Sequence, residues 1–171
     1  MMIRNAVKQD AAGIAKVHVD CWRTTYKGLM PDSLLDNLSY EQRQEQWENG
    51  IGTPQQILFV AEDENQEIVG FACGSKRESA KEPHAGDLMA IYVLEEHQGK
   101  GFGKELTAQI FNRLHELGCQ TVYVEVLAEN KSKFFYESLG AKLYQEEQMS
   151  IMGEDLDVLI YQWKSYDHLL L

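Results

Sequence analysis

The sequence predicts a mixed α/β domain whose elements occur in the order β-α-α-β-β-β-α-β-α-β-β. Two observations support this fold class: short apolar runs typical of strands, and longer segments whose apolar residues recur at helical spacing. A third is the glycine-rich segment 98–103, which separates a predicted strand from a predicted helix. The chain has 171 residues, 44% of them hydrophobic and 25% charged, and these values suit one compact domain over residues 1–171.

The N-terminal elements are one strand and two helices. Residues 2–6 are predicted to form the strand. Asp10 is placed to cap a helix whose apolar stripe contains Ile14, Val17 and Cys21. After a break at a glycine and a proline, Asp32 is placed to cap a second helix that runs to Trp47 and carries Leu34, Leu35 and Leu38.

The middle of the chain contains three predicted strands and a long helix. Residues 57–61 and 68–73 are expected to form a hairpin, the polar stretch 75–86 a surface loop, and residues 88–94 the next strand. The helix that follows the glycine-rich segment has an apolar stripe at Leu106, Ile110, Leu114 and Leu117. Gly118 is suited to end this helix.

The C-terminal elements are a strand, a short helix and a closing hairpin. The strand is indicated by alternation at Val122, Val124 and Val126. Asn130 is expected to cap a helix that runs to Leu139 and stops at Gly140. Residues 143–152 and 156–163 flank Gly153 and are predicted to form the hairpin.

Charge and hydropathy exclude some classes of partner. Sixteen Lys and Arg against 27 Asp and Glu give a net charge of −11, which repels polyanions and argues against a nucleic-acid partner. The same sign suits a cationic amine, although acidity also serves solubility. No apolar run approaches the ~20 residues of a membrane helix, and the first ten residues lack a leader pattern. We therefore expect a cytoplasmic protein without a membrane partner.

Cysteine and histidine spacing predicts no metal site. The five histidines show no H-E-x-x-H pattern, and the three cysteines form no C-x-x-C pair. The cysteines, which are Cys21, Cys73 and Cys119, are expected to be buried thiols.

The segment Gln98-Gly99-Lys100-Gly101-Phe102-Gly103 predicts an anion-binding turn. Glycines let the backbone turn tightly and approach a ligand closely. The first N–H groups of the following helix, together with its dipole, favour negative charge at this junction. The residue types and their position therefore favour a phosphate or pyrophosphate ligand.

Two common nucleotide patterns do not match this segment. A P-loop needs four residues between its glycines and then Lys-Ser/Thr, but three residues separate Gly99 from Gly103, and Lys104 is followed by Glu105. The dinucleotide pattern needs a third glycine at position 104, which is Lys104. What matches is Gln-x-x-Gly-x-Gly, which resembles the coenzyme A loop of the GNAT superfamily of acyltransferases.

The resemblance covers residues 86–145. Residues 90–93 are similar to the family's pantetheine-facing strand, and Asn130 with Phe135-Tyr136-Glu137 and Gly140 is similar to its second motif. Ser132 and Lys133 stand where that motif often carries alanine. The family fold is a mixed, mostly antiparallel sheet of about seven strands. Its two central parallel strands splay apart at the coenzyme A site, and about four helices pack on both faces.

The resemblance implies an acetyl-coenzyme A-dependent N-acetyltransferase that acts on a small amine, a polyamine or a peptide N-terminus. The co-substrate would be held by the strand and loop residues and by one side chain from the second motif. These residues are Ile91, Tyr92, Val93, Gln98, Gly99, Lys100, Gly101, Phe102, Gly103, Lys104 and Asn130. Asn130 also has a plain role as a helix cap, which is compatible.

Three residues are candidates for the chemistry. Asp87 and Glu125 are candidate bases that deprotonate the amine. Alternatively, Asp87 is only a turn residue beside Gly86, and Glu125 only pairs with a cation across the sheet. Tyr136 matches the family position for a general acid that protonates the leaving thiolate. Its alternative role is core packing among aromatic neighbours.

The acceptor side is less defined. In the family the early helices border the acceptor site, so Trp22 and Tyr26 are expected to line an aromatic pocket for the amine, unless they only pack on the sheet. Two other functions stay open: a non-catalytic acyl-coenzyme A sensor, and a nucleotide-binding regulator that uses the glycine loop for ATP. The sequence allows a monomer or a homodimer.

Overall fold

The computed structural model describes residues 2–79, 81–151 and 153–171. Ala80, inside the predicted surface loop, and Met152, at the predicted end of the hairpin's first strand, lie outside the described residues. The strands are β1 (Met2–Asn5), β2 (Ile57–Glu62), β3 (Ile68–Lys76), β4 (Ala85–Val93), β5 (Thr121–Leu127), β6 (Lys142–Ile151) and β7 (Glu154–Trp163). The α-helices are α1 (Ala11–Thr25), α2 (Asp32–Asp36), α3 (Tyr40–Gly50), α4 (Phe102–Glu116) and α5 (Ser132–Ser138). Short 3₁₀ turns are η1 (Lys8–Asp10), η2 (Glu95–His97) and η3 (Asp167–Leu169).

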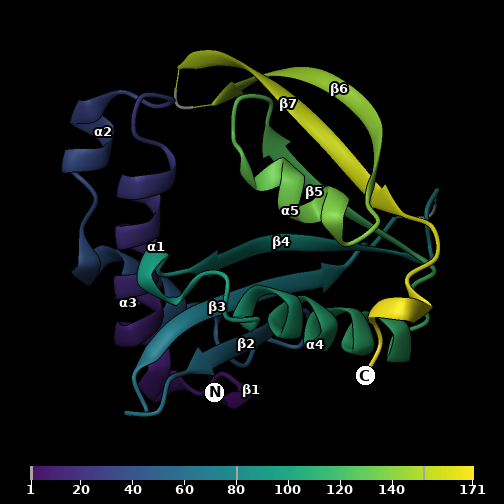
Figure 1. The fold of residues 1–171 in the computed structure, drawn as a ribbon, viewed down its shortest axis with the longest axis horizontal. Coiled ribbons are helices and arrows are strands. Elements are labelled where there is room, and N and C mark those ends of the chain that lie inside the picture. The colour runs from purple at the N-terminus through teal and green to yellow at the C-terminus, as the bar shows by residue number, and fades with distance from the viewer. Residues whose placement is uncertain (1, 80, 152) are drawn as a thin grey trace.

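The described strands form one seven-stranded sheet in the order β1-β2-β3-β4-β5-β7-β6 (Figure 1). Neighbouring strands are antiparallel except for β4 and β5, which are parallel. This arrangement confirms the predicted fold class and both predicted hairpins. The predicted strand at 88–94 begins earlier, at Ala85, so the loop before it is shorter than expected.

Helices cover both faces of the sheet. On β2, Ile57, Phe59 and Ala61 face the core under α4, whereas Leu58 and Val60 face the core under α1. This alternation arises because successive strand side chains point to opposite faces. Figure 1 shows α4 and α5 in front of the sheet and α1–α3 grouped together at one side.

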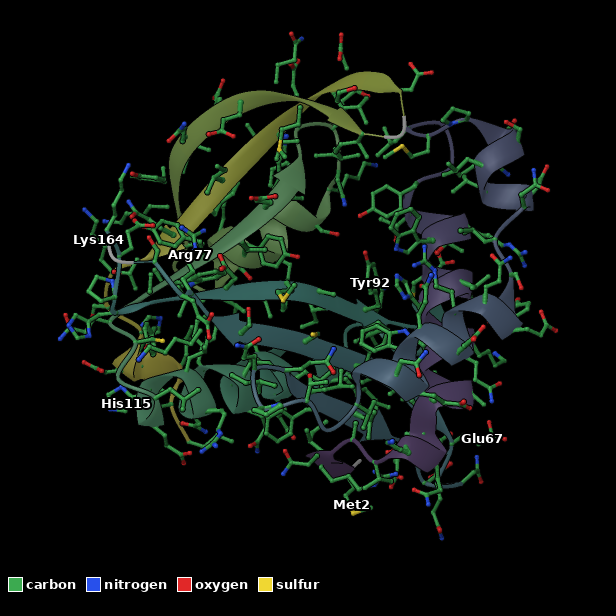
Figure 2. All side chains as sticks on the ribbon, turned by 180° about the vertical axis from the view of Figure 1, so that it is seen from behind. Met2, Glu67, Arg77, Tyr92, His115 and Lys164 are labelled. Carbon is green, nitrogen blue, oxygen red and sulfur yellow. The ribbon has the colours of Figure 1, made fainter. Side chains whose placement is uncertain are left out.

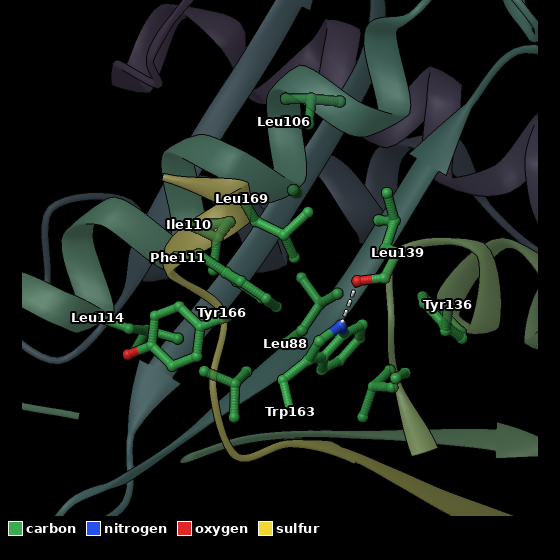
Figure 3. Close-up of a cluster of buried hydrophobic side chains, with 14 of the residues drawn as sticks. Leu88, Leu106, Ile110, Phe111, Leu114, Tyr136, Leu139, Trp163, Tyr166 and Leu169 are labelled. Atoms are coloured by element: carbon green, nitrogen blue, oxygen red, sulfur yellow. Dashed lines mark hydrogen bonds between the residues drawn. The ribbon is translucent and has the colours of Figure 1, made fainter. Parts of the chain in front are cut away.

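The core under α4 and α5 is closed by the C-terminal segment. Trp163 at the end of β7 is 1% exposed, and its indole Nε1 donates to the backbone oxygen of Leu139 at 3.0 Å (Figure 3). Its ring meets Phe111 edge-to-face, with 5.0 Å between the centroids. Such aromatic pairs contribute about 0.5–1.5 kcal/mol beyond the area that they bury. The second motif is therefore anchored to the centre of the core.

Two predicted helix starts need correction. The second predicted helix is two helices, α2 and α3, because Ser39 begins a new one by accepting the N–H of Gln42 on its hydroxyl at 3.2 Å. Asp32 is the first residue of α2 and provides no side-chain cap. Asp10 precedes α1, but its carboxylate accepts hydrogen bonds from the guanidinium of Arg4 instead of from the helix.

Candidate active site

The sheet opens between β4 and β5. The two strands are paired only at Ala85–Thr121, Gly86–Val122 and Asp87–Tyr123. Beyond these positions β4 continues along β3 to Val93, and β5 continues along β7 to Leu127. The carboxyl ends of two central parallel strands therefore diverge, which confirms the predicted splay.

The glycine-rich segment lies at the end of β4 and leads directly into α4. Gly99 and Gly101 have φ of +72° and +93°, values in the left-handed region that favours glycine. The side chain of Gln98 donates from Nε2 to the backbone oxygen of Val93 at 2.9 Å, which ties the loop to β4. The first N–H groups of α4 have no acceptor within the helix and are available to an anion.

A cleft of about 890 Å³ runs from this loop across to α5. Eight of the predicted cofactor-binding residues line it, namely Ile91, Val93, Gln98, Gly99, Gly101, Gly103, Lys104 and Asn130. A Cβ at Gly103 would lie 3.2 Å from the ring of Phe135, so even a methyl group there would press on this wall of the cleft. Two further lysines line the cleft, Lys27 and Lys131. The geometry fits a long ligand that carries phosphates at one end.

Three predicted cofactor-binding residues do not line this cleft. Lys100 is exposed, and Phe102 is a core residue that is only 5% exposed. Tyr92 follows Ile91 on the strand, so its side chain points to the other face and lines a second cavity. Figure 2 shows Tyr92 directed toward the helices that cover that face.

The second cavity has a volume of about 280 Å³ and adjoins the first. It lies between the diverged parts of β4 and β5, and its walls include Trp22, Tyr26, Tyr92 and Glu125. The residues that line both spaces are Ile91, Asn130, Ser132 and Tyr136. A group held in the cleft and a group held in the cavity would therefore meet beside Tyr136.

Tyr136 is positioned by the core behind it. The residue is 7% exposed, and its ring lies 5.6 Å from that of Phe135 and 6.1 Å from that of Trp163, as centroid distances. Within the described part of the chain, its hydroxyl has no hydrogen-bond partner. Burial, with a smaller contribution from Tyr26, raises the pKa of Tyr136 well above its usual value. The phenol is thus protonated and free to donate.

Asn130 joins the two spaces to the start of α5. It is 6% exposed, and its Oδ1 accepts the N–H of Ser132 at 2.8 Å. The N-cap position of α5 is Lys131, which provides no side-chain cap, so Asn130 lies one residue before the predicted capping position and closes the turn that leads into the helix.

The aromatic residues of the second cavity are bonded to one another. Trp22 donates from Nε1 to the hydroxyl of Tyr92 at 3.0 Å, and the hydroxyls of Tyr26 and Tyr92 lie 3.4 Å apart. The Trp22 and Tyr26 rings are 4.8 Å apart. Burial raises the pKa of Tyr92 well above its usual value, so this phenol stays neutral.

The two candidate bases lie in different places. Glu125 lines the second cavity, its backbone is opposite Ile160 on β7, and no ion pair involves it among the described residues. Asp87 lines neither space, because it lies where β4 is still paired with β5, and Arg77 binds its carboxylate through Nε at 2.9 Å and Nη2 at 2.7 Å. Figure 2 places Arg77 and Tyr92 toward opposite ends of the sheet. The structure thus brings Glu125 to the site and leaves Asp87 in an ion pair.

Several lining residues were not expected from the sequence. They are Met30, Met89, Leu127, Met149, Ile151 and Val158 in the second cavity, and Thr24, Lys27, Glu95, Glu129 and Lys131 in the cleft. They come from separate elements and share no local motif. Only Glu129 and Lys131 could have been expected from the sequence, because they are the neighbours of the predicted Asn130.

The described ranges contain neither a membrane-spanning helix nor a metal-binding cluster. None of the helices there has the length and apolar composition to span a bilayer. No group of three or more His, Cys, Asp or Glu side chains in residues 2–79, 81–151 and 153–171 is arranged to hold a metal ion. The three cysteines are buried and free, as expected.

Comparison with known proteins gives consistent results. The model of the acetyltransferase (GNAT) family matches residues 16–141. An uncharacterized N-acetyltransferase of Bacillus subtilis, YuaI, is 35% identical over 161 residues, which are 94% of this chain and 91% of that protein.

Solved structures share the fold at low sequence identity. The ribosomal-protein-alanine N-acetyltransferase of Brucella melitensis superposes with a TM-score of 0.75 at 23% identity, covering 95% of this chain and 99% of that one. The yncA acetyltransferase of Salmonella typhimurium, solved with acetyl-CoA, gives 0.72 at 21% identity, covering 95% and 92%. The chain belongs to the GNAT family of acetyltransferases, which confirms the predicted enzyme class, an N-acetyltransferase that uses acetyl-coenzyme A.

Proposed function

We propose that this enzyme transfers the acetyl group to a primary amine, either a small amine or a peptide N-terminus, with Glu125 as the base and Tyr136 as the general acid. The observation that carries the proposal is the junction of the cleft and the cavity, where Tyr136 lines both spaces and Glu125 lines the cavity. This arrangement supports the proposal, because a phenol and a carboxylate at these positions can give and take protons where donor and acceptor would meet.

The donor side is supported by the cleft. Gly99 and Gly101 allow the loop to approach a pyrophosphate closely, and the N-terminus of α4 favours its charge. Lys104, Lys27 and Lys131 supply positive charge along the cleft. The backbone of Ile91 and Val93, beyond the last residue paired with β5, is open to the pantetheine arm. Coenzyme A presents the acetyl group as a thioester, whose carbonyl carbon is the electrophile.

The acceptor must lose a proton before it attacks. Glu125 takes this proton from the ammonium, directly or through water, and the nitrogen lone pair then forms the C–N bond at the carbonyl carbon. The C–S bond breaks with its electron pair on sulfur, and Tyr136 donates a proton to that sulfur. The nitrogen releases its second proton to solvent, and solvent returns one to Tyr136. The products are an amide, a free thiol and one proton.

The experiment is a thiol-release assay with acetyl-coenzyme A, with and without amines. We expect thiol only when an amine is present, and the acetylated amine is identified by mass spectrometry. If coenzyme A raises the melting temperature of the protein but no amine is acetylated, the result supports the non-catalytic acyl-coenzyme A sensor instead. Stabilisation by ATP but not by coenzyme A would support the nucleotide-binding regulator.

A matched pair of variants tests the base. Glu125→Gln removes the carboxylate in the cavity, and we expect kcat/KM to fall by about 10²-fold or more. Asp87→Asn removes the same charge from the ion pair with Arg77. It should lower the melting temperature and leave the pH profile of kcat/KM in place. If instead Asp87→Asn lowers kcat/KM and changes its pH profile while Glu125→Gln does not, the base is Asp87.

A further inference from the structure

The walls of the acceptor cavity are mostly apolar. Three of the six methionines of the chain line it, together with Leu127, Ile151 and Val158. Methionine side chains are flexible and polarisable, so they adapt to apolar groups of different shape. At about 280 Å³ the cavity is slightly below the range of ~300–1,000 Å³ typical of small-molecule sites. A compact group, or the first side chain of a longer acceptor, fits this space.

Part of the apolar wall belongs to a separate cluster of buried residues that does not include Tyr136. Met30 and Leu35 pack with Leu127 and Val158 in one cluster of buried residues, and Met149 lies against that cluster from β6. The cluster joins residues of the segment that contains α2 to residues of the hairpin β6–β7, and Figure 1 shows these two parts of the chain near each other. This part of the cavity wall is thus built of apolar side chains.

Charge inside the cavity is limited to one carboxylate. Among the described residues that line it, Glu125 is the only acidic one, and none is Lys, Arg or His. The phenols do not compensate, because Tyr92 stays neutral and is already bonded to Trp22. Glu125 and Met89 are exposed, so the cost of a second ammonium group applies to the buried part of the cavity, where that group would lie against apolar side chains without a counter-ion. A net charge of −11 on the whole chain does not change this local arrangement.

A positive charge near Trp22 adds to the selectivity against acceptors with a second ammonium group. The guanidinium of Arg43 lies 5.6 Å from the centroid of the Trp22 ring, although Arg43 is not part of the cavity wall. A positive charge therefore lies close to Trp22, one of the residues that line the site. It disfavours a polycationic acceptor further.

We infer that the acceptor is a primary amine attached to a compact apolar group, and that polyamines and lysine-like diamines are poor substrates. This inference rests on the proposed function and specifies its substrate class. The single amine is placed beside Glu125 and Tyr136, and the apolar group occupies the methionine-lined end. The bonds made and broken are those of the acetyl transfer described above.

The test compares kcat/KM for thiol release at saturating acetyl-coenzyme A. One arm compares 2-phenylethylamine and isoamylamine with cadaverine, spermidine and ethanolamine. A second arm compares dipeptide amides that begin with Leu or Phe with those that begin with Asp or Lys, which separates free amines from peptide N-termini. In one of the two arms, we expect kcat/KM for the apolar acceptors to exceed that for the charged or polar ones by about 10-fold or more. This is the discrimination that apolar pockets provide.

The outcomes separate the two proposals. Equal or better turnover of spermidine, cadaverine or the Lys-first peptide overturns the inference and leaves acetyl transfer intact. Absence of thiol release with every amine, despite coenzyme A binding, overturns the proposed function and the inference with it.

A charge placed in the cavity provides a second test. Met149→Glu puts a carboxylate at the apolar end, at a half-buried position on β6. We expect it to lower kcat/KM for 2-phenylethylamine and to raise that for cadaverine. Tyr144→Glu is the matched control, because Tyr144 is on the same strand, 51% exposed, and lines neither space. An unchanged ratio in Met149→Glu, with the melting temperature preserved, contradicts the assignment of this end to the acceptor.

Discussion

Replacement of Tyr136 by phenylalanine separates the chemical role of its hydroxyl from the packing role of its ring. The ring is held between Phe135 and Trp163, and phenylalanine keeps the same contacts. The hydroxyl has no hydrogen-bond partner in the described part of the chain, so no buried group loses a bond. The free energy of unfolding should therefore change by less than about 1 kcal/mol.

The effect on the rate should be much larger. A positioned general acid contributes about 10²- to 10⁴-fold, so Tyr136→Phe should lower kcat by at least about 10²-fold and leave the binding of coenzyme A intact. Burial keeps the pKa of Tyr136 above its ordinary value of 10.0. The wild-type rate should therefore show no loss from this group up to roughly pH 10.

The assay measures thiol release under saturating conditions from roughly pH 6 to pH 10, with thermal melting of each variant beside it. Binding of coenzyme A is measured by calorimetry. A variant that folds, binds coenzyme A and retains kcat within about 2-fold would refute the role of Tyr136 as the acid. In that case the residue is a core aromatic that happens to lie at the junction.

Two other predictions concern the loop and the acceptor side. Gly101→Ala and Gly118→Ala carry similar strain, about 1–2 kcal/mol, because both positions have positive φ and open space around them. Only Gly101→Ala should raise the KM for acetyl-coenzyme A, and an equal rise in both contradicts the loop assignment. Burial, and then the charge of Arg43, lowers the pKa of His18 from 6.5 to about 4, so the unfolded chain binds this proton first as pH falls. Stability should fall by up to about 3 kcal/mol between pH 6.5 and 4, and urea unfolding of His18→Phe should lack this loss.

The donor side of the site was largely predictable because its residues are contiguous. Gly99 and Gly101 lie between a strand and a helix, Gly103 is in the first turn of that helix, and each feature is local in the sequence. The loop residues around Gln98 were therefore identified without knowledge of the fold. Side-chain direction on β4 was also predictable in principle, since Tyr92 alternates with Ile91 and Val93.

The split between α2 and α3 had a signal that was missed. Ser39 and Gln42 have the spacing of a capping box, and the hydroxyl of Ser39 does accept the N–H of Gln42. The leucines before Ser39, together with Trp47 after it, gave an apolar pattern that masked this start.

The acceptor cavity and the position of Asp87 were not predictable from the sequence. Asp87 lies beside Gly86 in the chain, but its partner Arg77 reaches it across the pairing of β3 with β4. Met30, Met89 and Met149 meet only after the sheet and helices assemble. No short pattern relates residues so far apart, because their proximity depends on the topology of the sheet.

The short pairing between β4 and β5 divides the catalytic apparatus between two parts of the molecule. The glycine loop and α4 follow β4, whereas Glu125, Asn130 and Tyr136 come from β5 and the segment after it. Three paired positions join these parts within the sheet, and the shared core completes the connection. Turnover therefore requires the two parts to be correctly positioned relative to each other, so a measurement of catalytic activity also measures their correct assembly. A chain cut between α4 and β5 would hold the glycine loop on one piece and the proposed acid and base on the other.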